Sequence, residues 1–187
     1  MKQNLIPAIR LTFVCMVFFM GIYSFIIWLP AQLAPSKGKG EIVTANNKII
    51  GWKLLGQKFT ADKYFWSRPS AVDYNAAGSG GSNKGPTNPD YLKQVQDRID
   101  TFLVHNPGIQ KSDIPSDLVT ASGSGLDPDV SVQGAYIQVK RIASTRKLPE
   151  QKVMDLVDHH IEKSLLGLFG PPSVNVLQLN NDLENLR

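Results

Sequence analysis

The chain opens with a long apolar stretch and then changes to a mixed hydrophobic and polar pattern. Residues 11–29, LTFVCMVFFMGIYSFIIWL, contain no charged side chain. A helix of this length spans about 28 Å at 1.5 Å per residue, close to the hydrocarbon thickness of a bilayer. Arg10 precedes the stretch, and Trp28 suits the membrane interface at its other end. The pattern therefore predicts one transmembrane helix.

A cleaved signal peptide is the alternative reading of this segment. Signal peptides have an apolar core of about 7–15 residues followed by an Ala-x-Ala-like cleavage site. The stretch here is longer, and residues 30–34, PAQLA, do not supply such a site. We therefore expect an uncleaved anchor, with residues 1–10 in the cytoplasm, 11–29 in the membrane, 30–40 as a linker and 41–187 as a soluble domain.

The basic residues near the apolar stretch bear on its orientation. Lys2 and Arg10 favour an N-terminus on the cytoplasmic side, whereas Lys37 and Lys39 oppose it. We expect the N-terminus inside and the soluble domain outside the inner membrane. Within the helix, the small residues Gly21 and Ser24 either let a second transmembrane helix approach or are incidental.

Beyond residue 40 the hydrophobic periodicity predicts an α+β domain with about three main helices and a small sheet. Strand-like runs lie at 49–55, 118–120 and 174–179, and helix-like runs lie at 89–105, 127–147 and 150–165. Asn88 and Asp127 stand where helix caps are expected, each followed by a proline that suits the first helical position. Residues 75–89 are rich in glycine, serine, asparagine and proline, which predicts a long loop.

Composition excludes several classes of protein. The chain has 187 residues, of which 42% are hydrophobic, so global disorder is excluded. One cysteine, Cys15, cannot form an internal disulfide framework. A net charge of +4 is too small to indicate a nucleic-acid partner.

Few residues indicate chemistry on their own. His159 and His160 are adjacent, so on a helix their side chains diverge by about 100°, and we expect no metal site. The phosphate-loop, dinucleotide and nucleophile-elbow patterns are absent from the sequence. Residues 122–125, SGSG, precede an expected helix, which allows an anion site but favours a tight turn. Asp127 and Asp129 are expected to cap that helix, and Arg68 has no partner identifiable from its neighbours.

Three segments together resemble a known family. They are residues 65–71, FWSRPSA; residues 80–89, GGSNKGPTNP; and residues 120–128, TASGSGLDP. Their order and spacing are similar to those of the C subunit of the Kdp-type high-affinity potassium-transporting P-type ATPase. Lys84 and the run at 131–135 depart from the family's usual residues, which puts the details of any ligand contact in question rather than membership.

The resemblance implies an accessory subunit of an ATP-driven potassium importer. Its partners would be a channel-like subunit, an ATP-hydrolysing subunit and a small single-span subunit. Such a C subunit supports assembly and raises the ATP affinity of the hydrolysing subunit, as a catalytic chaperone, without a covalently bound cofactor. The chain lacks the D-K-T-G phosphorylation motif, so it is not expected to be the hydrolase. Residues implied as possible nucleotide contacts or interface positions are Arg68, Ser122, Gly123, Ser124, Gly125, Asp127, Gln133, Gln138 and Arg141.

Three functions therefore compete. The first is a structural and regulatory pump subunit with its domain outside, docked over the outer mouth of the channel-like subunit. The second is a nucleotide-binding chaperone with a cytoplasmic domain, in which Ser122–Gly125, Gln133 and Arg141 contact ATP directly. The third is an unrelated membrane-anchored hydrolase, for which the sequence offers no evident Ser–His pairing.

Overall fold

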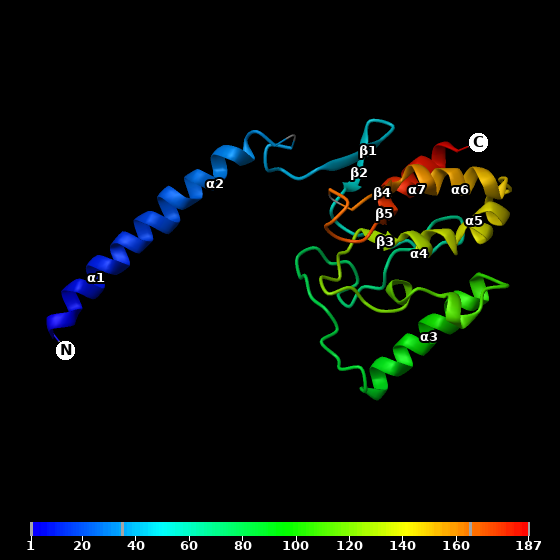
Figure 1. Cartoon of the computed structure of the whole chain (residues 1–187), viewed down its shortest axis with the longest axis horizontal. Helices are drawn as coiled ribbons and strands as arrows, with labels where there is room; N and C mark the ends of the chain where they lie inside the picture. The colour runs from blue at the N-terminus through cyan, green and yellow to red at the C-terminus, as the bar shows by residue number, and fades with distance from the viewer. Residues whose placement is uncertain (1, 35, 165, 187) are drawn as a thin grey trace. The chain divides into compact units, whose positions relative to one another are not determined.

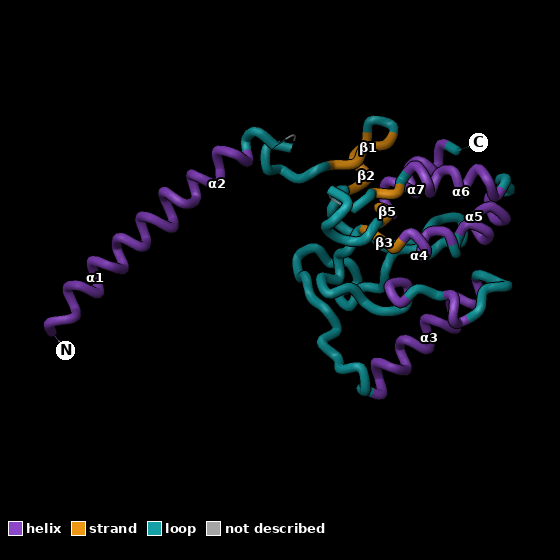
Figure 2. Tube along the Cα trace, in the orientation of Figure 1, coloured by secondary structure: helices purple, strands orange, loops and turns teal. Residues whose placement is uncertain are grey.

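The computed structural model describes residues 2–34, 36–164 and 166–186. The chain divides into two compact units, Met1–Glu41 and Ile42–Arg187. The first is helical and the second is an α+β domain, which confirms the predicted fold class (Figures 1 and 2).

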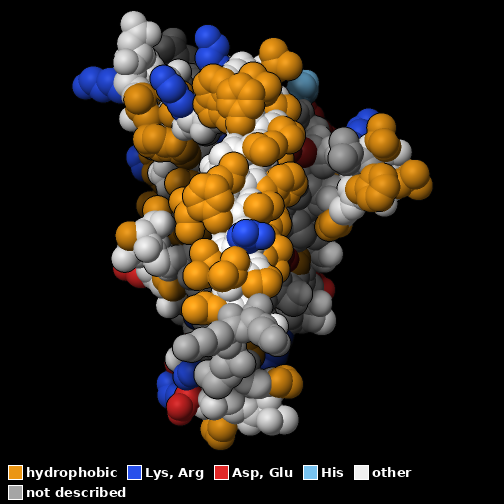
Figure 3. All heavy atoms as spheres, turned by 90° about the vertical axis from the view of Figure 1, so that its left-hand side faces the viewer, with side chains coloured by type: hydrophobic (Ala, Val, Ile, Leu, Met, Phe, Trp, Pro, Cys, Tyr) orange, Lys and Arg blue, Asp and Glu red, His pale blue; other side chains and the backbone are white. Residues whose placement is uncertain are grey.

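The first unit is built around one continuous run of helix. It comprises α1 (Lys2–Met16), the π-helical segment η1 (Val17–Tyr23) and α2 (Ser24–Ala31). The apolar stretch Asn4–Ala31 has 28 residues, enough for about 42 Å of helix. Hydrophobic side chains cover its surface (Figure 3), and none of its most apolar window is buried within the protein. The helix extends past the uncharged residues 11–29 at both ends.

The second unit contains two small antiparallel sheets and five α-helices in its described part. The first sheet pairs β1 (Ile42–Ala45) with β2 (Lys48–Trp52). The second has the strand order β3-β5-β4, formed by Asp129–Ser131, Ser173–Asn175 and Ile161–Glu162. The remaining elements are α3 (Pro89–His105), η2 (Lys111–Asp113), η3 (Ser116–Leu118), α4 (Val132–Tyr136), α5 (Val139–Arg146), α6 (Glu150–His159) and α7 (Val176–Asn185).

The core lies where α4 to α7 pack on one another and on the second sheet. Val153, Val157, Val174, Leu179 and Leu183 are fully buried there. The helix α3 joins this core through Phe102 and is reached by long irregular segments (Figure 2). Its predicted cap is confirmed, because the Asn88 side chain accepts a hydrogen bond from the Tyr91 N–H at 3.1 Å.

Two predicted elements around the third motif segment are wrong. Residues 116–118 form a 3₁₀ turn, and Val119 and Thr120 do not form a strand. Asp127 caps no helix, because Asp129–Ser131 is a strand and Ser131 caps α4 by accepting from the Gly134 N–H. The expected single helix is also divided, since α4 ends at Tyr136 and α5 begins at Val139. Pairing of Val130 with Val174 supplies the tertiary contact that overrides the local helix signal.

Two predictions near the C-terminal end are also corrected. The third helix stops at His159, because Ile161 and Glu162 pair with β5; its expected last residue, Leu165, lies outside the described residues. The expected strand 174–179 is only three residues long, Ser173–Asn175. Asn175 then accepts from the Gln178 N–H at 3.1 Å and starts α7, which buries Leu179 and Leu183.

Candidate functional site

The three motif segments meet in space. The Ser122 N–H donates to the Pro69 carbonyl at 3.1 Å, and the Gly80 N–H donates to the Ser124 carbonyl at 2.8 Å. Ser70 Oγ donates to the Gly125 carbonyl at 2.7 Å. Residues 122–125, which we name the motif turn, therefore bind both earlier segments.

Both hydroxyls of the motif turn accept hydrogen bonds from nearby backbone N–H groups. Ser122 Oγ accepts from the Gly125 N–H at 2.9 Å, and Ser124 Oγ accepts from the Leu126 N–H at 3.1 Å. Gly125 has a φ of +68°, which favours glycine. A Cβ there would lie 2.5 Å from Val72 Cγ2 and 2.8 Å from the Gly80 carbonyl oxygen. The turn thus acts as a packing element between segments.

Arg68 and Asp127, whose relation the sequence did not reveal, form an ion pair. Arg68 Nη1 lies 2.6 Å from Asp127 Oδ2, and both side chains are about three-quarters buried. Asp127 Oδ1 also accepts from the Asp129 N–H at 3.0 Å. The carboxylate therefore joins the first motif segment to the turn that leads into β3, which is a charge-assisted contact.

Gln138 and Arg141 lie in a buried polar network rather than on the surface. Gln138 Oε1 accepts from the Trp66 N–H and from Arg141 Nη2, both at 2.7 Å. Arg141 further donates to Asn106 Oδ1 and to the carbonyls of Asp62 and Tyr64. Both side chains are therefore fully engaged by the fold.

The Arg141 guanidinium stacks over the Trp66 ring, 4.6 Å from its centroid. Only 6% of the residue is exposed. Burial lowers the pKa of Arg141 to about 10, partly countered by the Asp62 carboxylate. The side chain remains a cation at neutral pH, held by three segments of the domain.

The other predicted positions lie apart from this cluster. Gln133 is exposed and donates through Nε2 to the Asp113 carbonyl at 3.3 Å. In the first unit, Ser24 Oγ donates to the Phe19 carbonyl at 3.1 Å, and a Cβ at Gly21 would meet nothing within 4 Å. A contact of Gly21 and Ser24 with another helix stays a prediction.

The adjacent histidines at 159 and 160 each contact a neighbouring residue of the domain. His159 Nδ1 lies 2.6 Å from the Asp155 carbonyl, and His160 Nε2 lies 3.0 Å from Asp182 Oδ2. Within residues 2–34, 36–164 and 166–186, no group of three or more His, Cys, Asp or Glu residues is placed to hold a metal ion.

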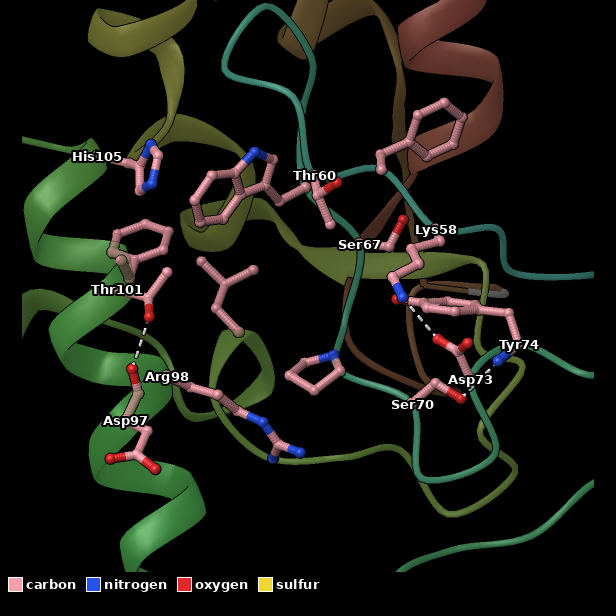
Figure 4. A pocket seen from close by; sticks show the side chains of 15 residues that line it. Lys58, Thr60, Ser67, Ser70, Asp73, Tyr74, Asp97, Arg98, Thr101 and His105 are labelled. Carbon is pink, nitrogen blue, oxygen red and sulfur yellow. Dashed lines mark hydrogen bonds and ion pairs between the residues drawn. The ribbon is translucent and has the colours of Figure 1, made fainter.

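A cleft of about 560 Å³, which sequence reasoning missed, opens between α3 and the segment 58–74 (Figure 4). Trp66, Phe102 and Leu118 give it apolar walls. Arg98 reaches from α3 toward the opposing segment and donates to the Val119 carbonyl at 3.0 Å. Lys58 on the other wall pairs with Asp73 at 2.7 Å.

The cleft could not be found by residue spacing because its walls come from segments that are distant in sequence. Its lining carries Lys58 and Arg98 but also Asp73 and Asp97, so these charges balance. Burial raises the pKa of Tyr74, whose hydroxyl donates to the Arg68 carbonyl. The one available signal was the aromatic first segment, which supplies Trp66.

In the described residues, one apolar helix of membrane-spanning length is joined to an α+β domain, which fits a single-span membrane protein. Residues 5–185 match the model of the family described as "K+-transporting ATPase, c chain". The chain belongs to this family, as the motif segments indicated.

Individual relatives match over nearly their full length. A protein of Flavobacterium psychrophilum is 55% identical over 185 residues, covering 99% of this chain and 100% of the relative. A protein of Bacteroides fragilis is 50% identical over 188 residues, covering 99% of this chain and 98% of the relative. A protein of Caldanaerobacter subterraneus subsp. tengcongensis is 47% identical over 184 residues, covering 98% of this chain and 95% of the relative. Each is named "Potassium-transporting ATPase KdpC subunit", which names a subunit rather than a catalytic activity.

Proposed function

We propose that this chain is a non-catalytic subunit of an ATP-driven, high-affinity potassium import complex. The observation that carries the proposal is the full-length match, at 50–55% identity, to proteins named as KdpC subunits of a potassium-transporting ATPase. A single span cannot enclose an ion path, so the path belongs to a channel-like partner in the inner membrane. An ATP-hydrolysing subunit and a small single-span subunit complete the assembly.

The chain stabilises this assembly and raises the ATP affinity of the hydrolysing subunit without holding ATP itself. Three features support an indirect effect. The motif turn is held between the two earlier motif segments by its own backbone hydrogen bonds. Each guanidinium nitrogen of Arg141 donates a hydrogen bond within the domain, and the residue is buried. The main cleft balances its basic residues with acidic ones, whereas a triphosphate site needs an excess of positive charge.

An indirect effect on ATP affinity has a thermodynamic consequence. If this subunit tightens ATP binding by some factor, ATP must tighten binding of this subunit by the same factor. A non-hydrolysable ATP analogue should therefore slow dissociation of the subunit from the pump. An unchanged dissociation rate, together with an unchanged association rate, contradicts the chaperone role but leaves the assembly role standing.

Topology separates the proposal from direct nucleotide binding. Single cysteines replace Ser36, Ser112 or Gln3 in a Cys15→Ala background, and intact cells receive a membrane-impermeant thiol reagent. Ser112 is exposed on the second unit and so reports on the domain itself. We expect labelling at Ser36 and Ser112, with Gln3 protected. This result would place the domain on the side away from cytoplasmic ATP. Labelling at Gln3 alone would place the domain in the cytoplasm and favour direct ATP contact.

The chaperone role is tested on the assembled pump. Potassium-stimulated ATP hydrolysis is measured against ATP concentration in complexes with and without this chain. We expect the KM for ATP to rise when the chain is missing. Equal KM values would refute the effect on ATP affinity, whereas a lower yield of intact complex would still support the role in assembly.

A further inference from the structure

The loop between β4 and β5 presents large apolar side chains to its surroundings. Leu166, Leu168 and Phe169 are 81%, 80% and 63% exposed. We name these three residues the apolar tip. The Gly167 N–H donates to the Ser164 carbonyl at 2.9 Å, which closes a turn at the start of the tip. Exposed leucine and phenylalanine side chains gathered in one loop mark a surface that is covered in use.

The base of this loop lies beside the point where the chain enters the domain. Ile42, the first residue of the domain, pairs with Trp52 across the first sheet. Lys53 follows Trp52 in the chain, and its Nζ lies 3.0 Å from Glu162 Oε1. Glu162 is the last residue before the loop. The tip therefore projects from the part of the domain to which the tether is attached.

The tether limits how far that part can lie from a membrane spanned by the apolar helix. Ten residues, 32–41, separate the end of α2 from the start of β1. Fully extended they reach about 33 Å, and as a flexible chain roughly 17 Å. Backbone hydrogen bonds from Lys37 to Ala34 and from Lys39 to Ser36 fold the tether into turns and shorten it further.

Charge around the tip matches an anionic lipid surface. Lys163 is the exposed first residue of the loop, and the loop itself contains no acidic residue. Glu162 at its base is paired with Lys53. Within the same unit, Lys48 is exposed on the hairpin of the first sheet. Basic side chains beside an apolar loop are the pattern that binds anionic headgroups while the loop enters the interface.

We propose that the apolar tip inserts into the headgroup and upper acyl region of the bilayer, on the side to which the domain is tethered. A standard protein interface uses about 20–30 residues on each side, so these three side chains would make only a small part of one. They suffice for a shallow lipid contact when the helix already holds the domain at the membrane. The contact gives the domain a second attachment point and so fixes its tilt.

The test places an environment-sensitive fluorophore on Phe169→Cys in a Cys15→Ala chain. The matched control carries it on Val104→Cys, because Val104 is 78% exposed on α3. Both full-length chains are inserted into vesicles of phosphatidylethanolamine and phosphatidylglycerol, with and without lipids brominated in the upper acyl chain. The same two chains are also examined in membranes that hold the whole pump.

We expect a blue-shifted emission and quenching by the brominated lipid at position 169 and neither at position 104, in both preparations. Leu166→Asp with Leu168→Asp should abolish the quenching at 169. Lys163→Glu should weaken it in phosphatidylglycerol vesicles and leave it unchanged in zwitterionic ones.

Two outcomes would overturn the proposal. One is water-like emission at position 169, equal to that at position 104. The other is a blue shift without lipid quenching in the whole pump, which would mean that a protein surface covers the tip. Unchanged tryptophan fluorescence of the domain in each variant shows that a negative result does not come from misfolding.

Discussion

Adding one methyl group at Gly125 tests whether the motif turn holds the three motif segments together. In Gly125→Ala the new Cβ would lie 2.8 Å from the Gly80 carbonyl oxygen, a backbone atom, and 2.5 Å from Val72 Cγ2. The φ of +68° adds a conformational penalty of about 1 kcal/mol for a residue with a Cβ. The steric conflict adds about 1–3 kcal/mol, because the second segment must move away.

Alanine also reduces the entropy of the unfolded chain, which returns about 0.4–1 kcal/mol. The net loss is then about 1–3.6 kcal/mol, a large share of the roughly 5–15 kcal/mol that stabilises a domain. Gly123 offers a matched control in the same turn, since a Cβ there meets nothing within 4 Å. Gly123→Ala should leave stability unchanged or raise it slightly.

The assay is urea denaturation of the full-length chain in detergent, followed by tryptophan fluorescence. Trp66 reports on the domain because its ring packs on Phe102 and His105. We expect a lower midpoint for Gly125→Ala than for Gly123→Ala, and a lower yield of assembled pump. Equal midpoints for the two variants would refute the packing argument for the turn.

Other substitutions test the buried network and the ion pairs. Arg141→Met leaves the Asn106 side chain and two carbonyls without their donor, and should lower the unfolding free energy by about 3 kcal/mol in the same urea assay. Burial, with Asp127 and Glu162 nearby, raises the pKa of Asp129. The stability that the protonated Asp129 side chain contributes at low pH is therefore lost as the pH rises through its folded-state pKa. Asp129→Asn should therefore raise the Tm at pH 7 and give no gain near pH 3; a gain of equal size at both would exclude the charge as the cause. A double-mutant cycle of Arg68→Ala and Asp127→Ala should give a coupling energy of about 1–2 kcal/mol in urea titrations, and strict additivity would show that the pair does not contribute.

The elements that the sequence predicted well are those specified by local patterns. The apolar helix and α3 each carry a long, consistent periodicity, and α3 begins at the expected Asn88 cap. The loop at 75–88 also follows from its composition. These features need no information about distant parts of the chain.

The elements that were mispredicted depend on distant partners. The strand Asp129–Ser131 exists because Val130 pairs with Val174, more than 40 residues away. The start of α7 was mistaken for a strand because apolar residues stand at 174, 176, 177 and 179, although Asn175 caps a helix. Proximity of Arg68 to Asp127, and burial of Arg141, likewise arise from chain crossings that no spacing rule reveals.

The link between Asn180 and Phe65 governs when the domain can fold during synthesis. The Asn180 side chain bonds the Phe65 N–H and carbonyl, at 2.8 and 2.9 Å, across 115 residues of sequence. The central strand β5 and the buried leucines of α7 also come from residues 173–185. Contacts of such long range form late, because the intervening chain must first be made and closed into a loop. The apolar helix is therefore synthesised long before its domain can complete its fold, and the fold is complete only after α7 has been made.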